Sequence, residues 1–111
     1  MAIYFLTNSS RALLAAFDQA IDGGHITTWE RDADGDYTHK AANWRQKLWL
    51  IAIEENQQLA FYTIPPKDRR IQLADYAYYH GHLLETFINH FPDQFSSASA
   101  TPRAVPSDSI G

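Results

Sequence analysis

Side chains suited to acid–base chemistry are concentrated in the C-terminal third of the sequence. Within eleven residues lie Asp75, Tyr76, Tyr78, Tyr79, His80, His82 and Glu85. Histidine titrates near neutral pH and tyrosine can hold a substrate oxygen, so these residue types suit general acid–base catalysis. In this hypothesis His80 or His82 acts beside Tyr79 as the acid or base. Glu85 then orients the histidine, and a further polar group must come from another element, because neighbouring residues of a helix diverge.

An acidic segment of the sequence suggests calcium at first sight. Asp32, Asp34 and Asp36 alternate as the first ligands of an EF-hand loop do. The sixth and twelfth positions of such a loop require Gly and Glu, but here they hold Tyr37 and Asn43. We therefore expect a plain hairpin turn and no metal at this segment.

The histidines of the predicted last helix suggest zinc. His82 and Glu85 are three residues apart and share one helix face. His80 points away from them, and no spacing in the sequence supplies a third ligand. We expect His82, Glu85 and Asn89 to form a solvated face, and we expect neither a metal nor a cofactor.

The same predicted helix carries two apolar stripes. One contains Ala77, Leu84, Phe87, Ile88 and Phe91. The other contains Tyr76, His80, Leu83 and Phe87, at spacings of four, three and four residues. Together they make the helix apolar over much of its circumference, which is more than one sheet face covers. The helix should therefore contact something besides its own sheet.

A subunit interface is the explanation that we favour, because aromatic residues are enriched at interfaces and symmetric dimers are common. A small-molecule pocket lined by Tyr76, Tyr79 and His80 is the alternative. Trp44 lies in a connection and either seals the sheet edge or forms part of a ligand wall. The candidate ligand or interface residues are Trp44, Tyr76, Tyr79, His80, Leu83 and Phe87.

Gly81 interrupts this helix near its middle. Glycine costs ~1 kcal/mol relative to alanine at such a position. We therefore expect the helix to approach the sheet, a partner or a ligand closely there.

Composition describes the domain that must position these residues. The chain has 111 residues, of which 45% are apolar and 20% charged, as in an ordinary single globular domain. There is no cysteine, which excludes disulfides, thiolate metal sites and cysteine nucleophiles. The formal net charge of −4 argues against nucleic-acid binding, and no apolar run has the ~20 residues of a membrane span. We expect a cytoplasmic protein.

The pattern of residues predicts an α+β fold in the order β-α-β-β-β-β-α. A first strand over residues 2–7 is followed by a helix that begins at Asn8-Ser9-Ser10 and ends at Gly23-Gly24. Further strands are predicted over residues 26–31, after Asp34-Gly35, over 47–54 and over 59–64. The expected architecture is an antiparallel sheet of about five strands with two helices packed on it.

Asp34-Gly35 is the pair that a two-residue type I′ hairpin prefers. With these two residues as the turn, Glu30 lies opposite His39 and the two can pair electrostatically.

The C-terminal part of the chain contains the last helix and a tail. The helix is predicted over about residues 74–91, and residues 69–73 fit either a short edge strand or its first turn. Pro92 ends the helix. Residues 96–111 are rich in Ser, Ala and Pro, so we expect a single domain over 1–95 and a flexible tail over 96–111.

The chain resembles a family of small uncharacterised bacterial proteins of similar length. The resemblance lies in Thr28-Trp29, residues 34–39, Trp44, Trp49-Leu50, residues 76–82 and His90-Phe91, and it covers residues 1 to about 100. It implies a bacterial, cytoplasmic, stand-alone domain, and it implies no activity or ligand.

These observations lead to three hypotheses of function. The first is a non-enzymatic domain that self-associates as a homodimer, through the last helix or a sheet edge, and binds a protein partner or a small ligand. The second is a small-molecule-binding protein or enzyme that uses the His, Tyr and Glu side chains of the last helix. The third is an acidic inhibitor or immunity-type protein that blocks a basic partner.

Overall fold

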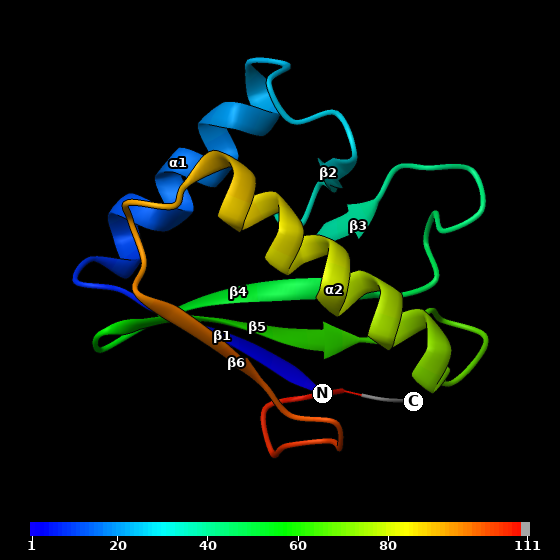
Figure 1. Ribbon diagram of the computed structural model, residues 1–111. Helices are drawn as coiled ribbons and strands as arrows, with labels where there is room; N and C mark the ends of the chain where they lie inside the picture. Colours follow the sequence, from blue (N-terminus) through cyan, green and yellow to red (C-terminus); the bar gives the residue numbers. More distant parts are fainter. Residues whose placement is uncertain (110–111) are drawn as a thin grey trace.

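The computed structural model describes residues 1–109 and shows an α+β fold, as the sequence predicts (Figure 1). Its elements are β1 (Ala2–Leu6), α1 (Ser10–Asp22), β2 (Trp29–Arg31), β3 (Tyr37–His39), β4 (Trp49–Glu55), β5 (Gln58–Ile64), α2 (Leu73–His90) and β6 (Ser97–Ala100). Within the described residues the sheet has six strands rather than about five. The first seven elements follow the predicted order.

The sheet is antiparallel throughout, with the strand order β2-β3-β4-β5-β1-β6. β4 and β5 pair over their full length, and β1 lies between β5 and β6. Both helices pack on one face of this sheet (Figure 1). The helices and the sheet therefore form two layers, and among residues 1–109 no helix covers the opposite face of the sheet.

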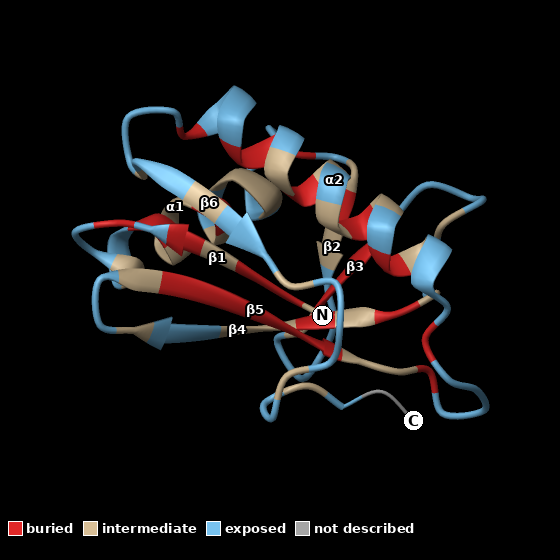
Figure 2. Cartoon of the chain, turned by 60° about the horizontal axis from the view of Figure 1, so that its bottom comes forward, coloured by how far each residue is buried: buried red, intermediate tan, exposed pale blue. Residues whose placement is uncertain are grey.

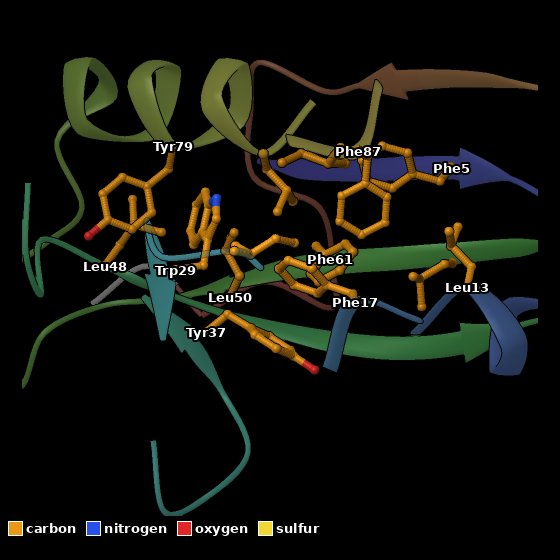
Figure 3. Packing of buried hydrophobic residues seen from close by; sticks show 14 of the residues in the cluster. Phe5, Leu13, Phe17, Trp29, Tyr37, Leu48, Leu50, Phe61, Tyr79 and Phe87 are labelled. Atoms are coloured by element: carbon orange, nitrogen blue, oxygen red, sulfur yellow. The ribbon is translucent and has the colours of Figure 1, made fainter. Parts of the chain in front are cut away.

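The core between the layers consists mainly of aromatic and leucine side chains (Figure 3). Phe5, Phe17, Phe61 and Phe87 are fully buried and their rings lie in mutual contact. The helix α1 begins where predicted, because the Ser9 side chain accepts a hydrogen bond from the backbone N–H of Ala12. Its buried side chains, Leu13 and Phe17, then pack in the core on the sheet.

The hairpin of β2 and β3 has a different register from the predicted one. Trp29, not Glu30, lies opposite His39. The backbone N–H of Gly35 bonds to the carbonyl of Asp32, and Gly35 has φ +85°. These features describe a type I turn followed by a left-handed residue, which makes a three-residue loop and shifts the register by one. The predicted pairing of Glu30 with His39 was wrong for this reason.

The predicted tail contains a strand. Residues 97–100 form β6 and pair with β1, so the boundary expected at residue 96 falls just before part of the sheet. The side chain of Asp108 further fixes this segment to β5, because it accepts hydrogen bonds from the backbone N–H and the hydroxyl of Thr63 and from the N–H of Val105. Propensity alone disfavours a Ser-Ala strand, and pairing with β1 overrides it.

The segment before the last helix is neither of the predicted alternatives. The helix α2 begins at Leu73, and residues 69–72 precede it without forming a strand. Among residues 1–109, no helix combines the length and the apolar character that crossing a membrane requires.

Candidate functional site

The candidate residues of α2 lie mostly inside the protein. Tyr79, Leu83 and Phe87 are fully buried and Tyr76 is 4% exposed, so four of the six residues belong to the core of their own chain. The second predicted stripe is thus the face that packs on the sheet (Figures 2 and 3).

Tyr79 has a structural task that explains its burial. Its hydroxyl donates to the carbonyl of Trp44 and accepts from the backbone N–H of Lys47 at 3.3 Å. It also shares a hydrogen bond of 3.1 Å with the hydroxyl of Thr38. These contacts fix the connection between β3 and β4 against α2. The Tyr79 hydroxyl is therefore already engaged and does not face a ligand.

Tyr76 and His80 lie on the side of α2 that faces β1 and β6. The Tyr76 hydroxyl lies 3.1 Å from the carbonyl oxygen of Ala2 and 2.9 Å from that of Thr101, and burial raises its pKa to about 12. The rings of Tyr76 and His80 stack with centroids 5.9 Å apart. Burial lowers the pKa of His80. No convergence of His80 with Tyr79 results, because the two side chains leave α2 in different directions.

His82 meets a histidine from another element. The Nε2 atom of His39 on β3 and the Nδ1 atom of His82 form a hydrogen bond across the two layers. The Nδ1 atom of His39 accepts the backbone N–H of Ala41 at 3.1 Å. On the far side of His82, its Nε2 atom is 3.9 Å from the carboxylate of Glu85. A chain of polar groups thus runs from the buried β3 to the surface.

The hydrogen bonds determine which nitrogens carry protons. Since His39 Nδ1 accepts from Ala41, the ring proton of neutral His39 must be on Nε2 and be donated to His82. The proton of neutral His82 is then on Nε2, toward Glu85. Each ring nitrogen has a task, and no lone pair is free to act as a general base. The arrangement is suited to holding α2 against β3 rather than to removing a substrate proton.

Burial is the main influence on the pKa of His39. His39 is 1% exposed, and burial together with the nearby His82 lowers its pKa to about 4. Trp29 and Tyr78 pack their rings against it, with centroids at 5.2 and 5.3 Å. His39 is therefore neutral near pH 7.

Trp44 is half-buried and belongs to the same aromatic group. Its ring stacks on that of Tyr78 at 3.8 Å with an interplanar angle of 5°. This stacking attaches the connection between β3 and β4 to α2.

The acidic turn uses its carboxylates locally. The side chain of Asp32 accepts the backbone N–H groups of Asp34 and Asp36, each at 2.9 Å. Burial, together with the charges of Asp32 and Asp34, raises the pKa of Asp36. Oxygens of the three carboxylates lie within 4.8 Å of one another. The turn thus has the hydrogen bonds of an Asp-rich hairpin.

A different face of α2 is exposed and apolar. We call it the outer stripe, and it consists of Leu73, Ala77, Gly81, Leu84 and Ile88. The side chains of Leu73 and Ile88 are 62% and 52% exposed, and Leu84 is half-buried. The spacing of four, four, three and four residues keeps these positions on one side of the helix. Three of them belong to the first predicted stripe, which the structure divides between core and surface.

Gly81 lies at the centre of the outer stripe. A Cβ atom built on Gly81 has no atom of the protein within 4 Å, apart from the helix's own backbone and its chain neighbours. The sheet is therefore not the reason for a glycine at this position.

The edge strand β6 lies alongside this face of α2 (Figures 1 and 2). After β6, the carbonyl of Thr101 accepts from Tyr76, and before β6 the ring of Phe95 packs on Phe87 with centroids 6.3 Å apart. The helix and the strand are thus tied together at both ends.

Comparison of the chain with protein-family models, with curated proteins and with solved structures finds no match for it.

Proposed function

We propose that the chain is a non-enzymatic protein-interaction module that forms a homodimer through the outer stripe of α2. One observation carries the proposal. Two large apolar side chains, Leu73 and Ile88, are more than half exposed on the same side of α2, and between them lies Gly81, above which the chain leaves open space. Isolated exposed apolar residues are ordinary on protein surfaces. A line of them along one helix is typical of helix–helix contact.

The outer stripe is complementary to itself. When two copies of α2 pack antiparallel across a two-fold axis near Gly81, Leu73 of one copy meets Ile88 of the other. Ala77 then meets Leu84, and the two Gly81 residues lie near the axis. Ala77 and Gly81 are small, which leaves room for Leu84 of the other copy and lets the helices approach closely, and a two-fold axis makes both halves of the contact identical.

The structure gives the catalytic alternative less support. The hydroxyl of Tyr79, both ring nitrogens of His39 and the Nδ1 atom of His82 are used in hydrogen bonds within the chain. A site for acid–base chemistry instead requires a group that can exchange a proton with a substrate.

Disrupting the outer stripe tests the proposal. The mass of the protein in solution, measured by light scattering or sedimentation over about a hundredfold range of concentration, should approach twice 12.6 kDa as concentration rises. In Ile88→Glu and in Leu73→Glu a charge replaces an apolar contact, so both variants should remain monomeric.

Ile53→Glu is the matched control, because Ile53 is 39% exposed on β4 and lies outside the outer stripe. This variant should dimerise like the unaltered protein. A monomer at every concentration, or a dimer that both α2 variants retain, would contradict the proposal.

A further inference from the structure

The outer stripe is too small to hold a stable dimer by itself. The fifteen intervals from Leu73 to Ile88 span about 22 Å of helix, and a strip about 10 Å wide along it covers about 220 Å². Stable interfaces bury about 800 Å² on each partner. A dimer through α2 therefore needs a second contact close to the outer stripe.

The edge strand β6 is the neighbouring surface that can supply it. As the last strand of the sheet, β6 has one side paired with β1 and one side free. The backbone N–H of Thr101 donates to Ala2 across the ladder. Because antiparallel ladders alternate, the N–H and C=O groups of Ala98 and Ala100 point away from β1. These groups are unsatisfied by the sheet and can pair with another strand.

The two edges of the sheet differ in how they are protected. At the other edge, Arg31 of β2 forms ion pairs of 3.0 and 2.9 Å with Asp18 and Asp22 of α1. Charges and a covering helix are common means of blocking an edge. β6 has the sequence Ser-Ala-Ser-Ala, without charge, proline or bulky side chain. Nothing on β6 itself opposes the approach of a second strand.

The positions of α2 and β6 fit a single two-fold axis. Tyr76 contacts Thr101 and Phe87 contacts Phe95, so α2 and β6 run antiparallel to each other. The midpoint between Tyr76 and Phe87 lies at Gly81, and the midpoint between Phe95 and Thr101 lies at Ala98. The centre of the outer stripe is thus level with the centre of β6. An axis through one centre passes close to the other.

We propose that two copies of the chain join β6 to β6 as antiparallel neighbours across the axis that brings their outer stripes together. The inference rests on the proposed function and specifies the partner and the geometry of the contact. A two-fold axis perpendicular to the sheet makes the two β6 strands antiparallel. The dimer then contains one continuous sheet with the two α2 helices side by side above its centre.

Hydrogen exchange at single amides tests the inference without altering the chain. In the dimer, the amides of Ala98 and Ala100 should exchange at least about tenfold more slowly than in the monomeric Ile88→Glu variant, because β6 pairing protects them. The amide of Ser99, which faces β1, is the internal control and should be similarly protected in both proteins.

A variant at the edge gives a second measurement. In Ser99→Lys two lysines approach each other across the axis, while the exposed Ser99 side chain makes no contact that β1 requires. The dissociation constant of the dimer, compared at the same salt concentration, should rise at least about tenfold. Circular dichroism should show that the variant keeps its fold. The matched substitution Ser107→Lys, also at an exposed serine of the C-terminal segment, should leave the dimer unchanged.

The outcomes separate this inference from the proposed function. If Ile88→Glu abolishes the dimer but Ala98 and Ala100 exchange rapidly in the unaltered dimer, the self-association stands and the β6 contact is overturned. If the unaltered protein is monomeric at every concentration, both fall. The continuous sheet is supported if the amides of Ala98 and Ala100 exchange slowly in the dimer but rapidly in the monomeric Ile88→Glu variant, and if Ser99→Lys associates more weakly.

Discussion

At the scale of single residues, the pair of His39 and His82 shows how a contact between distant segments gives a side chain its chemistry. His39 is buried, and both of its ring nitrogens form hydrogen bonds. Protonating His39 would place a second N–H where Nδ1 now accepts from Ala41. The neutral form is therefore part of the folded structure.

This burial predicts a dependence of stability on pH. The pKa of His39 is about 4 in the folded protein and about 6.5 in an unfolded chain, so the unfolded state binds more protons between these values. The free energy of unfolding should then rise with pH from about 4 to about 6.5, by at most about 3 kcal/mol. Urea unfolding at a series of pH values measures this slope.

Two substitutions make that measurement specific. His39→Gln removes the titrating group, so the slope between pH 4 and 6.5 should become shallower although the variant is less stable overall. The exposed His25 is the matched control, and His25→Gln should leave the slope unchanged. A slope that is the same in all three proteins would show that His39 is not its source.

At the scale of elements, Gly81 in α2 should affect folding and association in opposite directions. Gly81→Ala improves helix propensity by about 0.5–1 kcal/mol, and its methyl group enters open space in the single chain. Thermal unfolding at concentrations below the dissociation constant should therefore show a more stable monomer. The same methyl groups meet near the proposed two-fold axis, so sedimentation should show a weaker dimer.

The background of Ile88→Glu separates these two effects. There the chain is expected to be monomeric, and Gly81→Ala should only stabilise it. If Gly81→Ala strengthens or does not change the dimer of the otherwise unaltered protein, the helices do not approach each other at Gly81.

The elements also show what the sequence could predict. Ser9 at a helix start and the continuous apolar runs of β4 and β5 are local signals, so these elements were predicted correctly. The hairpin register was missed because Asp34-Gly35 fits both a two-residue and a three-residue loop, and the hydrogen bonds of Asp32 select the longer one. Pattern alone does not distinguish the two loops.

The remaining misses arise from contacts between distant segments. β6 has small side chains without the pattern of a strand, and it forms because β1 offers it a free edge. The two stripes of α2 were both predicted, but only the position of the helix on the sheet decides which of them is buried. The contact of His39 with His82 depends on the packing of β3 against α2, which no spacing in the sequence shows.

At the scale of the whole molecule, Asp108 connects the C-terminal segment to the centre of the sheet. Its buried carboxylate accepts three hydrogen bonds, two of them from Thr63 of β5. Asp108→Ala should lower the free energy of unfolding by at least about 2 kcal/mol, since hydrogen bonds to a charged group are lost. It should also speed cleavage by trypsin after the exposed Arg103, as followed by mass spectrometry.

Asp93→Ala is the control for this experiment, because Asp93 is exposed and lies outside the C-terminal segment that Asp108 connects to β5. Its rate of cleavage after Arg103 should equal that of the unaltered protein. Equal rates in Asp108→Ala as well would mean that the carboxylate does not hold the segment in place.

The place of β1 within the sheet has a consequence for how the chain reaches this structure. β1 is synthesised before both of its neighbours in the sheet, since Ala2 pairs with Tyr62 and Ile3 with Ala100. During synthesis β1 has no partner until β5 has emerged, and its second edge stays open until β6 has emerged. Such distant pairings slow folding and leave an unpaired strand accessible to other chains. The nascent protein should therefore be most prone to aggregation before β6 is complete.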